Sequence, residues 1–257
     1  GYRRQEQVGA QLIQVSSEIW CVRRLSYLTC SYIVNSRAGV VLVDAGMDST
    51  GGDMIEALRS LSFSPDRVKA VLLTHWHNDH AAGAKVVKDI SGAAIYYHAL
   101  EAPFLTRCTA HTGVRDYLAR NIPELGPLVL LKGLLGEAIP VAVEASNFVE
   151  DGDTILSDFE VITTPGHTAG HVSFYYHPQK ALFAGDALAV LNGNVHFMAR
   201  PVTLDKDAAR KSVVKCLRRE IEVLCPGHRE FLVEGTRKKC QRLADYAVTD
   251  KPWPLFG

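Results

Sequence analysis

Apolar runs of strand length alternate with segments of helical periodicity along the first third of the chain. The runs that alternate or stay apolar, and so predict strands, are 12–22, 28–35, 39–43 and 68–73. Between the third and fourth, segment 50–61 carries apolar residues at helical spacing: Met54, Ile55, Leu58 and Leu61. A second helix follows the fourth strand and extends to about residue 90. This part of the chain therefore predicts strands with interspersed helices.

The second half repeats this theme without repeating the sequence. Its predicted strands are 154–156, 159–164, 171–176, 181–184 and 223–225, and its predicted helices are 205–219 and 234–246. Two strand-rich halves that each end in helices predict two packed sheets with helices on the outside. Because no linker or low-complexity tract divides the chain, we expect a single domain spanning residues 1–257.

The segment from about 99 to 140 interrupts this pattern. It is rich in leucine and is punctuated by Pro123, Pro127 and Pro140, so it is typical of a helical insertion or cap rather than of core sheet. The leucines of 125–140 exceed what a solvated loop needs. Two interpretations stay open: a lid that forms an apolar wall of the pocket, or ordinary core or a dimer contact.

Composition excludes several classes of protein. The 257 residues are 47% hydrophobic and carry 28 basic and 28 acidic side chains, so no net field attracts nucleic acid. No apolar run approaches the roughly 20 residues needed to span a bilayer, so no membrane association is expected. The six cysteines form no C-x-x-C pair and predict reduced thiols in a cytoplasmic protein. The chain starts at Gly1 instead of Met, which leaves open a removed signal peptide.

The stretch "THWHNDH" concentrates side chains that bind metals. His75, His77, Asp79 and His80 lie within six residues. Their spacing differs from the H-E-x-x-H helix, whose two histidines stand four apart on one helical face. The apolar strand before them and the small residues after them instead predict a loop between a strand and a helix. Such loops, at the carboxyl end of a strand, are where α/β proteins usually place their sites.

Three later turns complete the set. His167 and His228 each follow a Pro-Gly turn after a predicted strand, and Asp186 follows Gly185 in the same way. The ordered pattern H-x-H-x-D-H, then His, Asp and His, resembles the metallo-β-lactamase superfamily over essentially the whole chain, including "VVLVDAG" with Asp44. That resemblance implies an α/β fold, the αβ/βα four-layer sandwich of two mixed β-sheets flanked by helices.

The resemblance also implies a site for two metal ions. The implied ligands are His75, His77 and His167 for the first ion, Asp79, His80 and His228 for the second, and Asp186 as a bridge. Imidazoles suit zinc, and the two carboxylates also admit iron or manganese. We therefore expect two divalent ions, zinc in the first place. Asp44 and His171 are expected to orient ligands, although His171 could instead simply begin a strand and bond to the backbone.

Paired ions hold a bridging hydroxide at neutral pH and neutralise the oxyanion that forms when it attacks. With Asp79 as the catalytic residue that orients this hydroxide or carries a proton, the expected reaction is hydrolysis of an ester, thioester, lactone or amide bond of a small-molecule substrate. The alternatives are phosphodiesterase or β-lactamase activity, a metal-dependent oxidoreductase and a non-catalytic binding protein. Oxidoreductases of this fold carry Glu at the position of His77, which disfavours that class. A homo-oligomer remains open.

Overall fold

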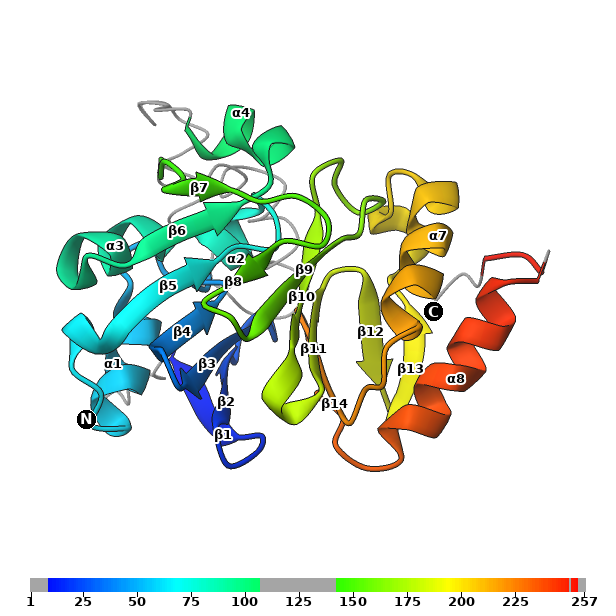
Figure 1. Ribbon diagram of the computed structural model, residues 1–257, viewed down its shortest axis with the longest axis horizontal. Coiled ribbons are helices and arrows are strands. Elements are labelled where there is room, and N and C mark those ends of the chain that lie inside the picture. Colours follow the sequence, from blue (N-terminus) through cyan, green and yellow to red (C-terminus); the bar gives the residue numbers. More distant parts are fainter. Residues whose placement is uncertain (1–8, 107–141, 250, 254–257) are drawn as a thin grey trace, which may run out of the picture.

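Two β-sheets face each other in the computed structural model, which describes residues 9–106, 142–249 and 251–253 (Figure 1). Helices α1 (Gly52–Ser60) and α3 (Ala84–Ser91) cover the outer face of the first sheet, and α7 (Lys206–Leu217) and α8 (Thr236–Ala247) cover the outer side of the second. The order of layers is therefore helices, sheet, sheet, helices. The predicted αβ/βα four-layer sandwich is confirmed.

The first sheet has seven strands in sequence order. They are β1 (Ala10–Gln14), β2 (Ile19–Arg24), β3 (Cys30–Ser36), β4 (Gly39–Val43), β5 (Val68–Leu72), β6 (Ala94–Tyr97) and β7 (Asn147–Phe148). Strands β1 to β4 pair antiparallel, and β4 to β7 pair parallel. The prediction of one strand over 12–22 is wrong. Polar residues Ser16 to Glu18 form a turn there, and Val15 N–H donates to the Ile19 carbonyl at 2.9 Å.

The second sheet has five strands in the order β14-β11-β10-β9-β8. They are β8 (Thr154–Ile155), β9 (Phe159–Thr163), β10 (Val172–Tyr176), β11 (Ala181–Gly185) and β14 (Val223–Pro226). A separate hairpin, β12 (Leu188–Leu191) and β13 (Asn194–Phe197), was not predicted. Its turn is Asn192-Gly193, with φ of 50° and 68°, which is the turn chemistry that two-residue hairpins favour.

The remaining helical elements are short. They are α2 (Asn78–Ala81), α4 (Ala102–Leu105), and the 3-10 turns η1 (Pro65–Arg67), η2 (Ala99–Glu101), η3 (His177–Gln179) and η4 (Arg200–Val202). Of the predicted insertion at 99–140, the structure describes only 99–106. Segment 125–140 lies outside the described residues, so the choice between a lid, ordinary core and a dimer contact is not tested.

Apolar side chains fill the space between the two sheets. Tyr32 from the first sheet and Phe183 from the second are both buried, and their ring centroids lie 5.3 Å apart. Five cysteines, Cys21, Cys30, Cys216, Cys225 and Cys240, are buried and form no disulfide. In the described part of the chain, no helix combines the length and apolarity needed to cross a bilayer.

The strands that precede the candidate ligands end at one edge of the sandwich. Strand β11 is parallel to β14, and β9 runs in the same direction because both β9 and β11 are antiparallel to β10. Two backbone hydrogen bonds tie this edge to the first sheet: Val172 N–H donates to the Thr74 carbonyl at 2.9 Å, and Cys30 N–H donates to the Gly227 carbonyl at 2.7 Å. Loops of both sheets therefore meet at this edge.

Candidate metal centre

The "THWHNDH" stretch folds as the loop after β5 followed by the single turn α2. His75 and His77 lie on the loop, and Asp79 and His80 lie in α2. The His80 N–H donates to the His77 carbonyl at 3.0 Å, which starts the turn. Gly83 permits this turn to approach the loop after β4, because a Cβ there would lie 2.4 Å from the Ala45 carbonyl oxygen. The prediction of a loop between a strand and a helix is confirmed.

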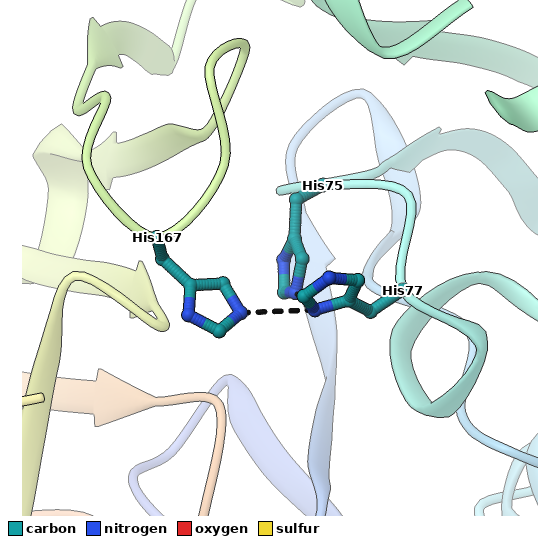
Figure 2. Close-up of side chains that lie close together, drawn as sticks. All are labelled: His75, His77 and His167. Atoms are coloured by element: carbon teal, nitrogen blue, oxygen red, sulfur yellow. Dashed lines mark hydrogen bonds between the residues drawn. The ribbon is translucent and has the colours of Figure 1, made fainter. Parts of the chain in front are cut away.

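One set of three side chains contains only imidazoles, and we call it the all-imidazole group (His75, His77 and His167; Figure 2). Two come from the loop after β5 and the third from the loop after β9 in the other sheet. The His77 Nδ1 lies 3.1 Å from the His75 Nε2 and 2.9 Å from the His167 Nε2. One candidate ligand atom from each residue lies within 4.8 Å of the other two.

The second set combines a carboxylate with two imidazoles, and we call it the mixed group (Asp79, His80 and His228). The His228 Nε2 lies 3.3 Å from both the His80 Nε2 and the Asp79 Oδ2. Asp186 lies between the two groups: its Oδ2 is 3.3 Å from the His167 Nε2 and 3.4 Å from the His228 Nε2. All seven predicted ligands thus converge, four from the first sheet and three from the second.

Hydrogen bonds at the far side of the rings fix which nitrogen faces the centre. The His80 Nδ1 lies 2.9 Å from an Asp44 carboxylate oxygen, and the His167 Nδ1 lies 2.6 Å from the Val202 carbonyl oxygen. Because those oxygens accept from N–H, the Nε2 atom of each ring carries the lone pair when the ring is neutral, as it is in a metal ligand. These lone pairs face other ligand atoms, and the buried Asp186 Oδ1 has no hydrogen-bond partner. Divalent cations satisfy converging lone pairs and a buried oxygen that has no hydrogen bond, so the residues fit the expected metals.

Asp44 and His171 hold other residues of the site in place. The Asp44 carboxylate accepts from the Thr74 N–H at 2.8 Å, next to His75, as well as from His80. The buried His171 bonds to the Thr164 hydroxyl at 2.8 Å through Nδ1, and its Nε2 accepts from the Asp186 N–H at 3.0 Å. His171 therefore bonds to backbone, and that backbone belongs to a candidate ligand, so the geometry supports an orienting role.

The two groups differ in electrostatics. Burial lowers the pKa of His75 well below its usual range, and burial together with His167 lowers the pKa of His77 to about 4. Although burial disfavours its charge, the carboxylates of Asp79 and Asp186 raise the pKa of His80 to about 9. The pKa of His228 rises well above its usual range for the same reason, against the effect of burial. Without metal, His75 and His77 are therefore neutral at pH 7, whereas His80 and His228 in the mixed group are protonated.

Two contributors to the centre were not predicted from the sequence. The Thr29 hydroxyl donates to the Asp79 Oδ2 at 3.3 Å from the loop before β3. Glu101, in η2, is buried and accepts hydrogen bonds from both loops that carry the all-imidazole group. Neither residue stands in a recognisable motif. Thr29 and Glu101 can be recognised only in the fold, where loops that are distant in the sequence meet.

Similarity to known proteins agrees with this arrangement. A model of the metallo-β-lactamase superfamily matches residues 28–228. The chain is 29% identical over 202 residues to a probable metallo-hydrolase, YflN, of Bacillus subtilis, which covers 73% of this chain and 74% of that protein. It is 30% identical over 157 residues to a hydroxyacylglutathione hydrolase of Pectobacterium carotovorum, covering 60% of this chain but only 44% of the relative.

Solved structures share the fold. The BLEG-1 B3 metallo-β-lactamase superposes with a TM-score of 0.64 at 22% identity, covering 93% of this chain and 100% of that one. The TTHA1623 protein in a di-iron-bound form superposes with a TM-score of 0.61 at 25% identity, covering 82% of this chain and 93% of that one. From the ordered ligand motifs, the four-layer sandwich and the matched family model, the chain belongs to the metallo-β-lactamase superfamily.

Proposed function

We propose that this protein is a binuclear metal-dependent hydrolase that cleaves an ester, thioester, lactone or amide bond of a small molecule. The observation that carries the proposal is the convergence of seven side chains from both sheets into overlapping three-residue sets, with the buried Asp186 Oδ1 lacking a hydrogen bond among them. A non-catalytic protein has no need to keep every position of such a set.

The ligands are assigned by position. The all-imidazole group would hold one ion, the mixed group would hold the other, and Asp186 would contact both, with zinc as the first candidate for a set rich in imidazole. Two divalent ions in such a site make water a good nucleophile at neutral pH and neutralise the charge that develops on the attacked group.

Asp79 is the proposed proton carrier. Its Oδ2 accepts from the Thr29 hydroxyl and lies 3.3 Å from the His228 Nε2, which orients the carboxylate towards the centre. Although burial opposes its charge, His80 and His228 lower the pKa of Asp79, so its carboxylate is ionised at neutral pH. An ionised carboxylate there can accept a proton from water and pass it to the leaving group.

Aromatic side chains next to the ligands favour a substrate with an apolar part. The Trp76 ring lies 4.5 Å from the His77 ring and stacks on Phe104 at 4.6 Å, and the Tyr27 ring lies 6.0 Å from that of His228. Within the proposed bonds we place thioesters first, because several relatives are hydroxyacylglutathione hydrolases. β-Lactams are the second candidate, because the sandwich matches the fold of B3 metallo-β-lactamases.

The test combines metal content with turnover. Purified protein is analysed for bound metals and assayed against ester, thioester, lactone, amide, phosphodiester and β-lactam substrates, before and after chelation and after zinc is restored. We expect about two ions per chain and hydrolysis of a carbonyl compound that chelation abolishes and zinc restores. Full hydrolysis by metal-free protein would overturn the proposal. Selective phosphodiester cleavage, or oxygen turnover with bound iron, would replace it with the corresponding alternative.

A further inference from the structure

Glu101 is a buried carboxylate outside the seven candidate ligands. It is the last residue of η2 and is only 1% exposed. Its Oε2 accepts from the Trp76 N–H at 2.8 Å, and its Oε1 accepts from the Thr168 hydroxyl at 2.9 Å and from the Gly170 N–H at 2.8 Å. Both oxygens are therefore engaged by donors, and each oxygen serves a different loop.

Those two loops carry the all-imidazole group. Trp76 stands between His75 and His77 on the loop after β5, and Thr168 directly follows His167 on the loop after β9. The two loops belong to different sheets. One side chain thus spans the boundary between the sheets directly beside the ligands of one metal position. Among the residues that the structure describes, Glu101 makes no contact of this kind with the mixed group, whose side chains are held by Asp44 at His80 and by Thr29 at Asp79.

The surroundings are shaped to this carboxylate. A Cβ at Gly170 would lie 2.7 Å from the Glu101 Oε1 and 2.9 Å from the Leu100 Cβ, so a larger residue would displace the contact. Burial raises the pKa of Glu101, and the three donors act in the opposite direction. The donors match an ionised carboxylate, which only accepts, and an unpaired buried carboxylate would be costly.

We infer that Glu101 is a positioning residue that locks the loop of His75 and His77 to the loop of His167, and so sets the geometry of the all-imidazole metal position. The inference deepens the proposed function and rests on its assignment of a metal to that group. Partners that orient metal ligands typically contribute 10–100-fold to metal affinity. We expect Glu101 to raise metal affinity at the all-imidazole position only.

Glu101→Gln is a selective test because an amide has one accepting oxygen. When that oxygen faces Thr168 and Gly170, the amide NH₂ meets the Trp76 N–H, and two donors oppose each other. The loop of His75 and His77 is then released while the fold keeps a side chain of the same shape. We expect metal affinity at the all-imidazole position to fall by roughly 10–100-fold, with the mixed position unchanged.

The experiment titrates metal-free protein with Co²⁺ and follows its visible absorption, which differs between a position with three imidazoles and one with two imidazoles and Asp79. His167→Ala and His228→Ala provide reference spectra for each position. Glu150→Gln is the matched control, since that glutamate side chain is 73% exposed, and wild-type titration is expected for it. Thr168→Val removes a single donor to Glu101 and should weaken the same position to a smaller extent.

Wild-type Co²⁺ affinity at both positions in Glu101→Gln would overturn the inference, and so would equal weakening of both. If Glu101→Gln does not fold by circular dichroism, Thr168→Val decides, and an unchanged all-imidazole position in it overturns the inference. Failure of the proposed function is separate. Wild-type protein that binds two Co²⁺ ions and hydrolyses no substrate would refute hydrolysis, while the titrations would still test Glu101.

Discussion

The all-imidazole group and the mixed group both contact Asp186, but their histidines differ in protonation before a metal binds. Burial keeps His75 and His77 neutral, so their lone pairs are available without loss of a proton. In the mixed group the carboxylates that attract a cation also raise the pKa of His80 to about 9, so metal must displace protons there. A nearby carboxylate thus adds charge for the metal and at the same time adds competition from protons.

The largest expected effect comes from removing one ligand of each group. His167→Ala and His228→Ala should each lose about one of two ions and lower kcat/KM by more than about 100-fold, because loss of even an outer partner costs 10–100-fold. Elemental analysis and substrate kinetics measure both quantities. Retention of both ions by either variant would contradict the assignment of ligands to groups.

Gly227→Ala should weaken both groups together. A Cβ at residue 227 would lie 2.4 Å from the Asp186 Oδ1 and 2.7 Å from the His80 Cε1, so Asp186 must move, and it contacts both groups. Crowding of this kind typically costs about 1–3 kcal/mol of unfolding free energy. Denaturant titration with and without zinc measures the change. A variant that loses metal at one position only would show that Asp186 is not shared.

Asp44→Asn should weaken the mixed group most, because Asp44 contacts His80 directly and reaches the all-imidazole group only through Thr74, next to His75. Asparagine tolerates the left-handed backbone of residue 44, where φ is 60°, but its NH₂ cannot accept from the His80 Nδ1–H. We expect metal affinity at the mixed position to fall roughly 10–100-fold, measured by cobalt titration. Weakening confined to the all-imidazole position would reverse our view of which group Asp44 supports.

The smallest effect is the pH dependence of metal-free stability. The pKa of His80 is raised, so its contribution is fully present below about pH 6.5 and is lost as pH rises towards 9. The pKa of His77 is lowered to about 4, so its contribution is present above about pH 6.5 and is lost as pH falls towards 4.

Metal-free protein should therefore have its highest Tm near neutral pH. Each proton that the folded and unfolded chains bind to different extents changes the unfolding free energy by up to about 1.4 kcal/mol per pH unit, which is about 3–6 °C in Tm for a chain of this size. Saturating zinc should remove the alkaline decline, because the ion takes the place of the protons. Thermal scans between pH 4 and 9 measure this, and a metal-free Tm that rises steadily to pH 9 would contradict it.

The sequence predicted the layers and the convergence of the candidate ligands because each ligand comes shortly after an apolar strand, and three of them, His167, Asp186 and His228, directly follow a glycine. Such a signal is local: Pro165-Gly166 before His167 can be read without knowing the fold. The roles of these residues as metal ligands remain predictions. The hairpin at 188–197 was missed although Asn192-Gly193 signals it. Glu101 could not be found, because its burial depends on two loops that meet only in the fold. Trp76, on one loop, is 25 positions from it, and Thr168 and Gly170, on the other loop, are 67 and 69 positions from it.

Placing the ligands on both sheets has a consequence for the stability of the chain as a whole. His77 and His167 are 90 residues apart in the sequence, and His80 and His228 are 148 apart. An ion held by either pair is a cross-link that closes a long loop, in the way a disulfide does. In the chain-entropy treatment of cross-links, closing a loop of about 100 residues is worth about 4.7 kcal/mol. The metals would then act as reversible cross-links between the two halves of the sandwich. Loss of metal would lower the stability of the fold as well as abolish activity.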